Sequence, residues 1–167
     1  FDTVHFVQAT FQDLLENDRL QSNFDFIFSS FAIHHLEMEG LTEVTHVPFD
    51  EFGYVHPDDI KKAIRPNTKM VVVNHSSNVI GTVQPVAEIG KICKEAGVLF
   101  VLDASQSAGA NPIDMKAMGI DALAFTGHKC LMGPTGIGGS YIMKDIPVKG
   151  TRFGGTGVRS AQKTPLR

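Results

Sequence analysis

A lysine stands between a short apolar run and a glycine-rich segment. The run Ala122–Thr126 leads into Gly127, His128 and Lys129, and Gly133-Pro-Thr-Gly-Ile-Gly-Gly139 follows shortly after. A lysine at the junction of a buried strand and a loop is partly desolvated, which disfavours the ammonium form and lowers its pKa. The neutral amine of Lys129 could then form a Schiff base with an aldehyde. An ordinary surface lysine in a turn is the alternative.

An acidic residue ends the preceding apolar run, Val98–Asp103. An apolar run without alternation is typical of a parallel strand covered on both faces, and ligands of open α/β sheets bind at the carboxyl ends of such strands. Asp103 could pair with the pyridinium nitrogen of pyridoxal phosphate, and Gln106 could reach a ring oxygen. For Asp103 taken alone, a helix cap or a turn carboxylate is the more usual explanation. Its combination with Lys129, at the end of the next expected strand, favours the cofactor.

Three segments between about residue 41 and about residue 156 follow one another in a specific order. They are Asn74-His-Ser-Ser-Asn-Val-Ile-Gly81, Val101-Leu-Asp-Ala-Ser-Gln-Ser-Ala-Gly109 and Phe125-Thr-Gly-His-Lys-Cys-Leu-Met-Gly-Pro-Thr-Gly-Ile-Gly-Gly139. This pattern resembles the large domain of the class V aminotransferase-fold enzymes, in particular the cysteine desulfurase and selenocysteine lyase group. The resemblance implies pyridoxal 5'-phosphate as cofactor, a cysteine-like amino acid as substrate, lyase or transferase chemistry that leaves alanine, and a homodimer in the full-length family.

The resemblance also implies roles for individual residues around the cofactor ring. Lys129 would form the Schiff base, and Asp103 would pair with the pyridinium nitrogen. Gln106 would contact the phenolic oxygen, and Asn78 would lie against the cofactor on the same side. Lys129 and Asp103 are therefore the expected catalytic residues.

Other residues would hold the cofactor phosphate. The resemblance assigns this role to Thr126 and His128, and it makes Thr156 the residue that reaches the phosphate of the partner subunit's cofactor. A plain flexible turn is the alternative for the segment Gly154-Gly-Thr156. No metal site is expected, because the adjacent histidines His34 and His35 lack the spacing of a zinc site.

The family pattern is incomplete in this sequence. The N-terminal phosphate-binding loop and the segment with the ring-stacking histidine are not present, and the sequence stops where the small C-terminal domain would begin. That domain supplies the arginine for the substrate carboxylate and the cysteine that accepts sulfur, and neither Cys93 nor Cys130 matches this cysteine. We therefore expect a module that is incomplete and inactive alone.

The first forty residues resemble a different family. The segment Phe24–Leu36 is similar to the fourth-strand motif of class I S-adenosylmethionine-dependent methyltransferases, in which the turn near Thr10–Asp13 would lie by the adenine. The glycine-rich loop for the methionine part of that cofactor is absent, so this piece would be non-functional. An inactive fragment or chimera is thus the alternative to the pyridoxal phosphate enzyme. The strand expected over Phe24–Ser30 could also take the place of the family's missing strand before Leu41.

The alternation of expected strands and helices predicts an α/β fold with an open, mostly parallel sheet. We divide the chain into a methyltransferase-like segment (1–40), a partial pyridoxal phosphate-binding domain (41–150) and a flexible tail (151–167).

The glycine segment 133–139 would let the backbone pass close to the lysine loop. Strands are expected over 4–9, 24–30, 45–48, 69–74, 98–103, 122–126 and, antiparallel, 139–143, and helices over 11–20, 58–64 and 85–96, the last with Cys93 in the core.

The composition of the chain argues against nucleic acid and membranes as binding partners. The chain has 167 residues, is 43% hydrophobic and carries a net charge of −3, which gives no electrostatic reason to bind nucleic acid or an anionic membrane. No apolar run approaches the roughly 20 residues that span a bilayer. Two cysteines without a disulfide pattern fit the cytoplasm. The first residue is Phe, which indicates a segment of a longer protein.

Overall fold

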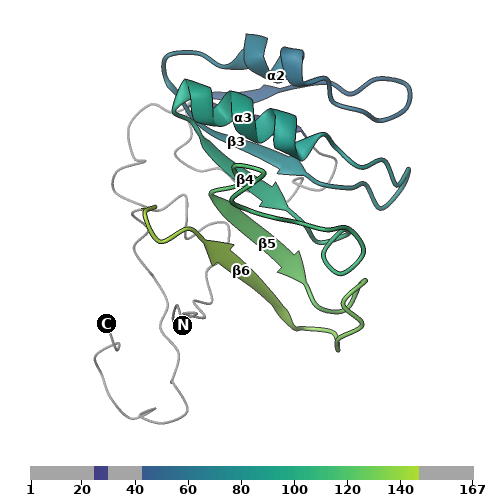
Figure 1. Cartoon of the computed structure of the whole chain (residues 1–167). Helices are drawn as coiled ribbons and strands as arrows, with labels where there is room; N and C mark the ends of the chain where they lie inside the picture. The colour runs from purple at the N-terminus through teal and green to yellow at the C-terminus, as the bar shows by residue number, and fades with distance from the viewer. Residues whose placement is uncertain (1–24, 30–42, 147–167) are drawn as a thin grey trace.

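The computed structural model describes residues 25–29 and 43–146 (Figure 1). A six-stranded sheet with the order β2-β1-β3-β4-β5-β6 forms its centre. The strands are β1 (Asp25–Ser29), β2 (Glu43–His46), β3 (Thr68–Asn74), β4 (Leu99–Asp103), β5 (Ala122–Thr126) and β6 (Gly138–Ile142).

All neighbouring strands are parallel except the last pair. β1 pairs in parallel with β2 and with β3, β3 with β4, and β4 with β5, while β6 runs antiparallel to β5. The expected open, mostly parallel sheet is thus confirmed. Its parallel strands end at one edge, where the connecting loops gather (Figure 1).

Two helices lie on the same face of the sheet (Figure 1). α2 (Pro57–Ala63) begins with proline at its first position, with Asp58 and Asp59 in its first turn and Lys61 and Lys62 in its last, as the helix dipole favours. α3 (Val86–Ala96) ends at Gly97, whose φ of 67° suits a residue without a Cβ. Among the described residues no helix is long and apolar enough to cross a membrane.

The core lies between the helices and the sheet. Alternating residues of β3 and β4 face the helices, where they meet apolar side chains of α2 and α3: Val71, Val73, Phe100, Leu102, Ile60, Ile89 and Cys93. The intervening residues of β3, Met70 and Val72, are also fully buried. The absence of polar alternation in β3 and β4 therefore reflects burial on both faces. Cys93 lies in the core, as its helical spacing predicts.

Most predicted elements agree with the structure to within one residue. The strand predicted over 45–48 is wrong by two residues, because β2 pairs with β1 from Asp25↔Glu43 to Phe28↔His46. Pro48 also has no backbone N–H to donate to a strand pair. The strand expected over 24–30 is confirmed as β1, which lies between β2 and β3. The predicted strand 4–9, helix 11–20 and tail 151–167 lie outside the described residues.

Candidate functional site

Three parallel strands bring polar residues to one edge of the sheet. Asn74, the last residue of β3, is paired with Asp103, the last residue of β4. Asp103 is in turn paired with Ala124 of β5, and Thr126 ends that strand two residues later. This is the edge at which open α/β sheets bind ligands.

Asp103 is half-buried and fixed by its own turn. Its Oδ1 accepts a hydrogen bond from Ser105 N at 2.9 Å, and its backbone oxygen accepts one from His75 N, also at 2.9 Å. The side chain thus acts as a turn carboxylate, which was the alternative reading of the sequence. Because a carboxylate has two oxygens, this role leaves Oδ2 for a second partner.

Lys129 is half-buried in a loop that is closed by backbone hydrogen bonds. Met132 N donates to Lys129 O at 2.8 Å, and Gly133 N donates to Gly127 O at 2.7 Å. Gly127 N donates to Ile137 O at 2.7 Å, and a Cβ on Gly127 would lie only 3.0 Å from that same oxygen. The glycines therefore let the segment 133–139 pass close to the lysine loop, as expected from the sequence.

Thr126 and His128 lie beside Lys129 and contact each other. Thr126 Oγ1 is 2.8 Å from His128 Nδ1, and the side chain of His128 is exposed. A hydroxyl and an imidazole thus lie next to each other at the end of β5. Both groups can donate hydrogen bonds to an anion.

The turn after β4 contacts the lysine loop. Cys130 Sγ donates to the backbone oxygen of Gln106 at 3.4 Å, and a Cβ on Gly109 would lie 2.9 Å from the Cys130 carbonyl oxygen. Gln106 and Lys129 are therefore held on neighbouring segments. The Cys130 thiol is turned toward the Gln106 backbone.

Asn78 lies at the exposed tip of the loop between β3 and α3. A bridge between Ser76 and Val83 closes the base of this loop, and Gly81 N donates to Ser77 O at 3.1 Å. These contacts fix the backbone on both sides of Asn78, but the Asn78 side chain is exposed. Thr156 lies outside the described residues.

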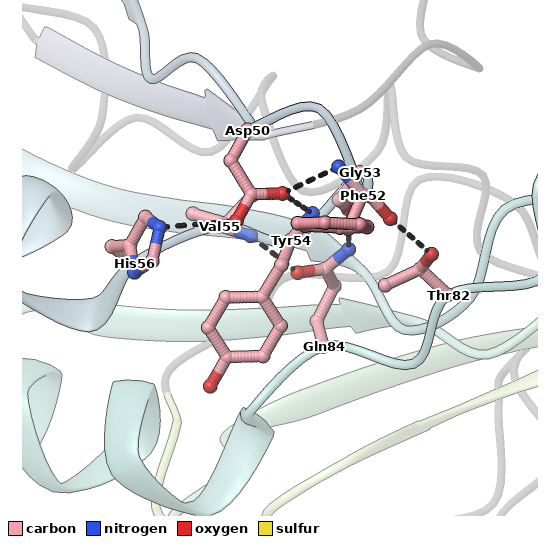
Figure 2. A network of polar contacts seen from close by, with 8 residues as sticks. All are labelled: Asp50, Phe52, Gly53, Tyr54, Val55, His56, Thr82 and Gln84. Atoms are coloured by element: carbon pink, nitrogen blue, oxygen red, sulfur yellow. Dashed lines mark hydrogen bonds and ion pairs between the residues drawn. The ribbon is translucent and has the colours of Figure 1, made fainter.

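A buried glutamine anchors this loop to the segment that precedes α2 (Figure 2). Gln84 Oε1 accepts from Val55 N at 2.8 Å, and Gln84 Nε2 donates to Gly53 O at 2.7 Å. Thr82 Oγ1 adds a hydrogen bond to Phe52 O at 2.6 Å. In the same network Asp50 accepts from Phe52 N and Tyr54 N, and its second oxygen lies 3.2 Å from His56 Nε2.

Sequence reasoning gave no role to a buried histidine and serine in the same region. His75 Nδ1 lies 2.8 Å from Ser107 Oγ, and both side chains are buried. Burial lowers the pKa of His75, because the charged imidazolium loses hydration. The available signal was positional, since each residue lies just past the end of an apolar strand and inside a recognised segment.

The chemistry of this edge fits pyridoxal phosphate. Within the described part of the chain the ends of β4 and β5 carry a carboxylate, a side-chain amide, a hydroxyl, an imidazole and an amine: Asp103, Gln106, Thr126, His128 and Lys129. The cofactor has a ring nitrogen, a phenolic oxygen, a phosphate and an aldehyde. Each of these has a partner of suitable chemistry at this edge.

Residues 25–164 match the family Aminotransferase class-V. The chain belongs to this family. The match begins at β1, so it includes part of the segment that resembled a methyltransferase. That resemblance and the boundary near residue 41 stay predictions.

The relatives of this class-V aminotransferase chain include cysteine desulfurases. The chain is 40% identical over 123 residues to the cysteine desulfurase IscS of Dictyoglomus turgidum, a match that covers 74% of the chain and 31% of that protein. It is 46% identical over 113 residues to a probable mitochondrial cysteine desulfurase of Dictyostelium discoideum, covering 68% of the chain and 25% of that protein. The chain thus spans about a third or less of these relatives.

Solved structures agree with the family assignment. A structure of SspA in complex with cysteine has a TM-score of 0.75 at 33% identity and covers 86% of this chain and 44% of that one. The apo structure of a cysteine desulfurase from Thermococcus onnurineus has a TM-score of 0.64 at 36% identity and covers 73% of this chain and 32% of that one.

Proposed function

We propose that the chain is the cofactor-binding part of a pyridoxal phosphate-dependent enzyme that removes sulfur from cysteine and leaves alanine. The observation that carries the proposal is the placement of Asp103 at the end of β4 and Lys129 just past the end of the adjacent parallel strand β5. The similarity to cysteine desulfurases supports the choice of reaction. The bound cofactor would supply an electron sink for bonds at the substrate Cα.

Lys129 and Asp103 would do the chemistry at the ring. The Lys129 amine would bind the cofactor aldehyde and accept or return a proton at the substrate Cα. Oδ2 of Asp103 would face the ring nitrogen and keep it protonated, while Oδ1 holds the turn through Ser105 N. Gln106 would contact the phenolic oxygen from the same turn.

The phosphate would be bound by the end of β5. Thr126 Oγ1 and His128 Nδ1, which are 2.8 Å apart, would turn from each other to the phosphate oxygens. Asn78 would approach the ring from the loop after β3. Thr156 would reach the phosphate of a partner subunit in a homodimer, and we retain the cytoplasm as the expected compartment because both cysteines are free.

We further propose that these 167 residues bind the cofactor but do not release sulfur unaided. Sulfur transfer needs a thiolate that can reach the substrate sulfur. Burial and the nearby Asp121 charge raise the pKa of Cys93 to about 12, which keeps it a core thiol. The Cys130 thiol donates to Gln106 O. Cys93 is therefore not a suitable sulfur acceptor, and we propose that the Cys130 thiol, which is directed to the Gln106 backbone, does not reach the substrate sulfur.

Absorbance titration of the purified protein with pyridoxal phosphate tests the cofactor part. We expect a saturable visible band with the wild type, loss of the band in Lys129→Ala, and an unchanged band in Lys91→Ala, which removes an exposed lysine of α3. A wild-type spectrum that equals the Lys129→Ala spectrum would overturn the proposal.

Incubation with cofactor and cysteine tests the reaction. We expect no alanine or sulfide above the level given by free cofactor. Turnover that persists in the Cys93→Ser and Cys130→Ser variants but is lost in Lys129→Ala would show that the 167 residues of this chain suffice for the reaction. Our inference of inactivity would then be wrong.

A further inference from the structure

A histidine and a serine, both buried, are hydrogen-bonded across the carboxyl edge of the sheet. His75 directly follows β3 and is 4% exposed, while Ser107 lies in the turn after β4 and is 1% exposed. His75 Nδ1 and Ser107 Oγ are 2.8 Å apart. Because burial of a polar group is costly unless the group is paired, each residue depends on the other.

The surroundings of Ser107 indicate which group donates. Ser107 Oγ has a second acceptor, Ala104 O, at the longer distance of 3.5 Å. That carbonyl already accepts from Ser107 N at 3.1 Å and from Ala108 N at 2.8 Å. A carbonyl oxygen offers two lone pairs, so we assign the hydroxyl proton to the shorter contact with His75 Nδ1, and the His75 proton to Nε2.

The backbone of His75 is fixed on both sides. His75 N donates to Asp103 O at 2.9 Å, and His75 O accepts from Gln84 N at 2.9 Å. The Gln84 side chain is itself bound to Gly53 and Val55 (Figure 2). His75 is therefore a fixed point against which the turn after β4 can be held.

Ser107 is the neighbour of Gln106, and the backbone oxygen of Gln106 accepts from Cys130 Sγ at 3.4 Å. The histidine–serine hydrogen bond thus joins the loop that carries Asn78 to the turn that carries Gln106. Asp103 precedes this turn, and its backbone oxygen accepts from His75 N.

We propose that His75 is a positioning residue of the cofactor site, which acts through Ser107 on the turn that carries Gln106. This inference rests on the proposed function, since Gln106 matters only where pyridoxal phosphate binds. The His75 ring would not contact the cofactor directly, because it is buried and its Nδ1 is engaged by Ser107. Burial also lowers the pKa of His75, because the charged imidazolium loses hydration.

Ser107→Ala tests the positioning role through the dissociation constant for pyridoxal phosphate. We expect the constant to rise by about tenfold, as for the loss of a buried hydrogen bond. In a Gln106→Ala background the same change is expected to alter it by less than about twofold, because coupled residues are not additive. Ser105→Ala, in the same turn, is the matched control and leaves the constant unchanged.

Two substitutions of His75 add a rescue test. His75→Asn retains an acceptor near the position of Nδ1 and should keep the wild-type dissociation constant to within about threefold. His75→Phe leaves the Ser107 hydroxyl only the more distant Ala104 O, at 3.5 Å, and should raise the constant by about tenfold. Equal losses in the two variants, or an equal effect of Ser107→Ala with and without Gln106, would indicate a merely structural role and overturn the inference.

The histidine nitrogens can be observed without the cofactor. In the cofactor-free protein, nitrogen NMR should show His75 Nδ1 as a hydrogen-bonded acceptor and Nε2 protonated, and an Nδ1 without any hydrogen bond would overturn the contact on which the inference rests. If the wild type fails to bind pyridoxal phosphate, both the proposed function and this inference fail. If it binds and Ser107→Ala binds equally well, the inference alone fails.

Discussion

The two carboxylate oxygens of Asp103 have different tasks in the proposed site. Oδ1 accepts from Ser105 N and shapes the turn, whereas Oδ2 would meet the ring nitrogen. An asparagine at this position retains an oxygen for the turn but carries no negative charge. The structural task and the chemical task can therefore be separated by one substitution.

Asp103→Asn should leave the affinity for pyridoxal phosphate within about threefold of the wild type, because one charge-assisted contact is replaced and the turn is kept. The exchange of the alanine Cα hydrogen for deuterium in the presence of the cofactor should slow by about a hundredfold, as for other lost electrostatic stabilisers. Proton NMR of alanine measures it, with Asp114→Asn as the exposed control. Equal exchange rates would remove Asp103 from the site.

The two cysteines should react very differently with a disulfide reagent. Cys93 is fully buried, and desolvation followed by the Asp121 charge raises its pKa to about 12, whereas Cys130 is exposed. A raised pKa means that Cys93 remains protonated at about pH 9, where an unperturbed thiol is largely ionised. We expect one reactive thiol in the native protein, two in denaturant, and none in native Cys130→Ser. Rapid reaction of two native thiols would contradict the packing of α3.

At the scale of elements, the site depends on loops that are tied together away from the reactive groups. The loop that carries Asn78 begins at β3 and ends at α3, and Gln84 binds it to residues 53–55 (Figure 2). These contacts involve backbone groups that a smaller side chain would leave unpaired.

Gln84→Ala should lower the free energy of unfolding by about 2–3 kcal/mol, because Val55 N and Gly53 O lose their buried partner. Thr82→Val removes the hydroxyl that donates to Phe52 O at a less buried position. This substitution should lower the free energy of unfolding by less than about 1 kcal/mol. Urea unfolding of both variants gives the comparison. A smaller loss for Gln84→Ala than for Thr82→Val would show that the glutamine is not the anchor.

Gly90→Ala should destabilise the protein although alanine is the better helix former. A Cβ on Gly90 would overlap the carbonyl oxygen of Met118, and Gly119 approaches Gly90 so closely that its own Cβ would lie 3.1 Å from Gly90 O. Helix propensity favours alanine by about 1 kcal/mol, and overpacking costs about 1–3 kcal/mol. We expect a net loss of about 1 kcal/mol in urea unfolding, whereas Lys91→Ala, on the exposed side of α3, changes little. A stabilised Gly90→Ala would contradict the close contact.

At the scale of the whole molecule, the sheet followed from the sequence because its central strands are short apolar runs. Val98–Asp103 needed no tertiary information, because an unbroken apolar run is typical of a strand buried on both faces. Ala122–Thr126 could be predicted as the next short apolar run, although most of its residues are half-buried in the structure. The start of β2 could not be obtained in this way, because it is set by pairing with β1 across residues 30–42.

The candidate site was predictable to the extent that its residues follow apolar strands. Asp103 and Lys129 do so directly, and the pairing of β4 with β5 brings their strand ends together. The roles of Gln84, His75 and Ser107 were not predictable, because each depends on a partner that lies at least 29 residues away in the chain. Contacts at such separations appear only when the sheet has formed.

Our central claim, that the carboxyl edge of β4 and β5 is a pyridoxal phosphate site with Lys129 as its attachment point, is tested most directly by borohydride reduction. The protein is saturated with the cofactor, reduced, digested and examined by mass spectrometry for pyridoxyl-modified peptides. We expect one label per chain on the peptide that contains Lys129 and, in Lys129→Ala, only the weak labelling of exposed lysines such as Lys91. A label spread evenly over the lysines, and unchanged in Lys129→Ala, would contradict the claim.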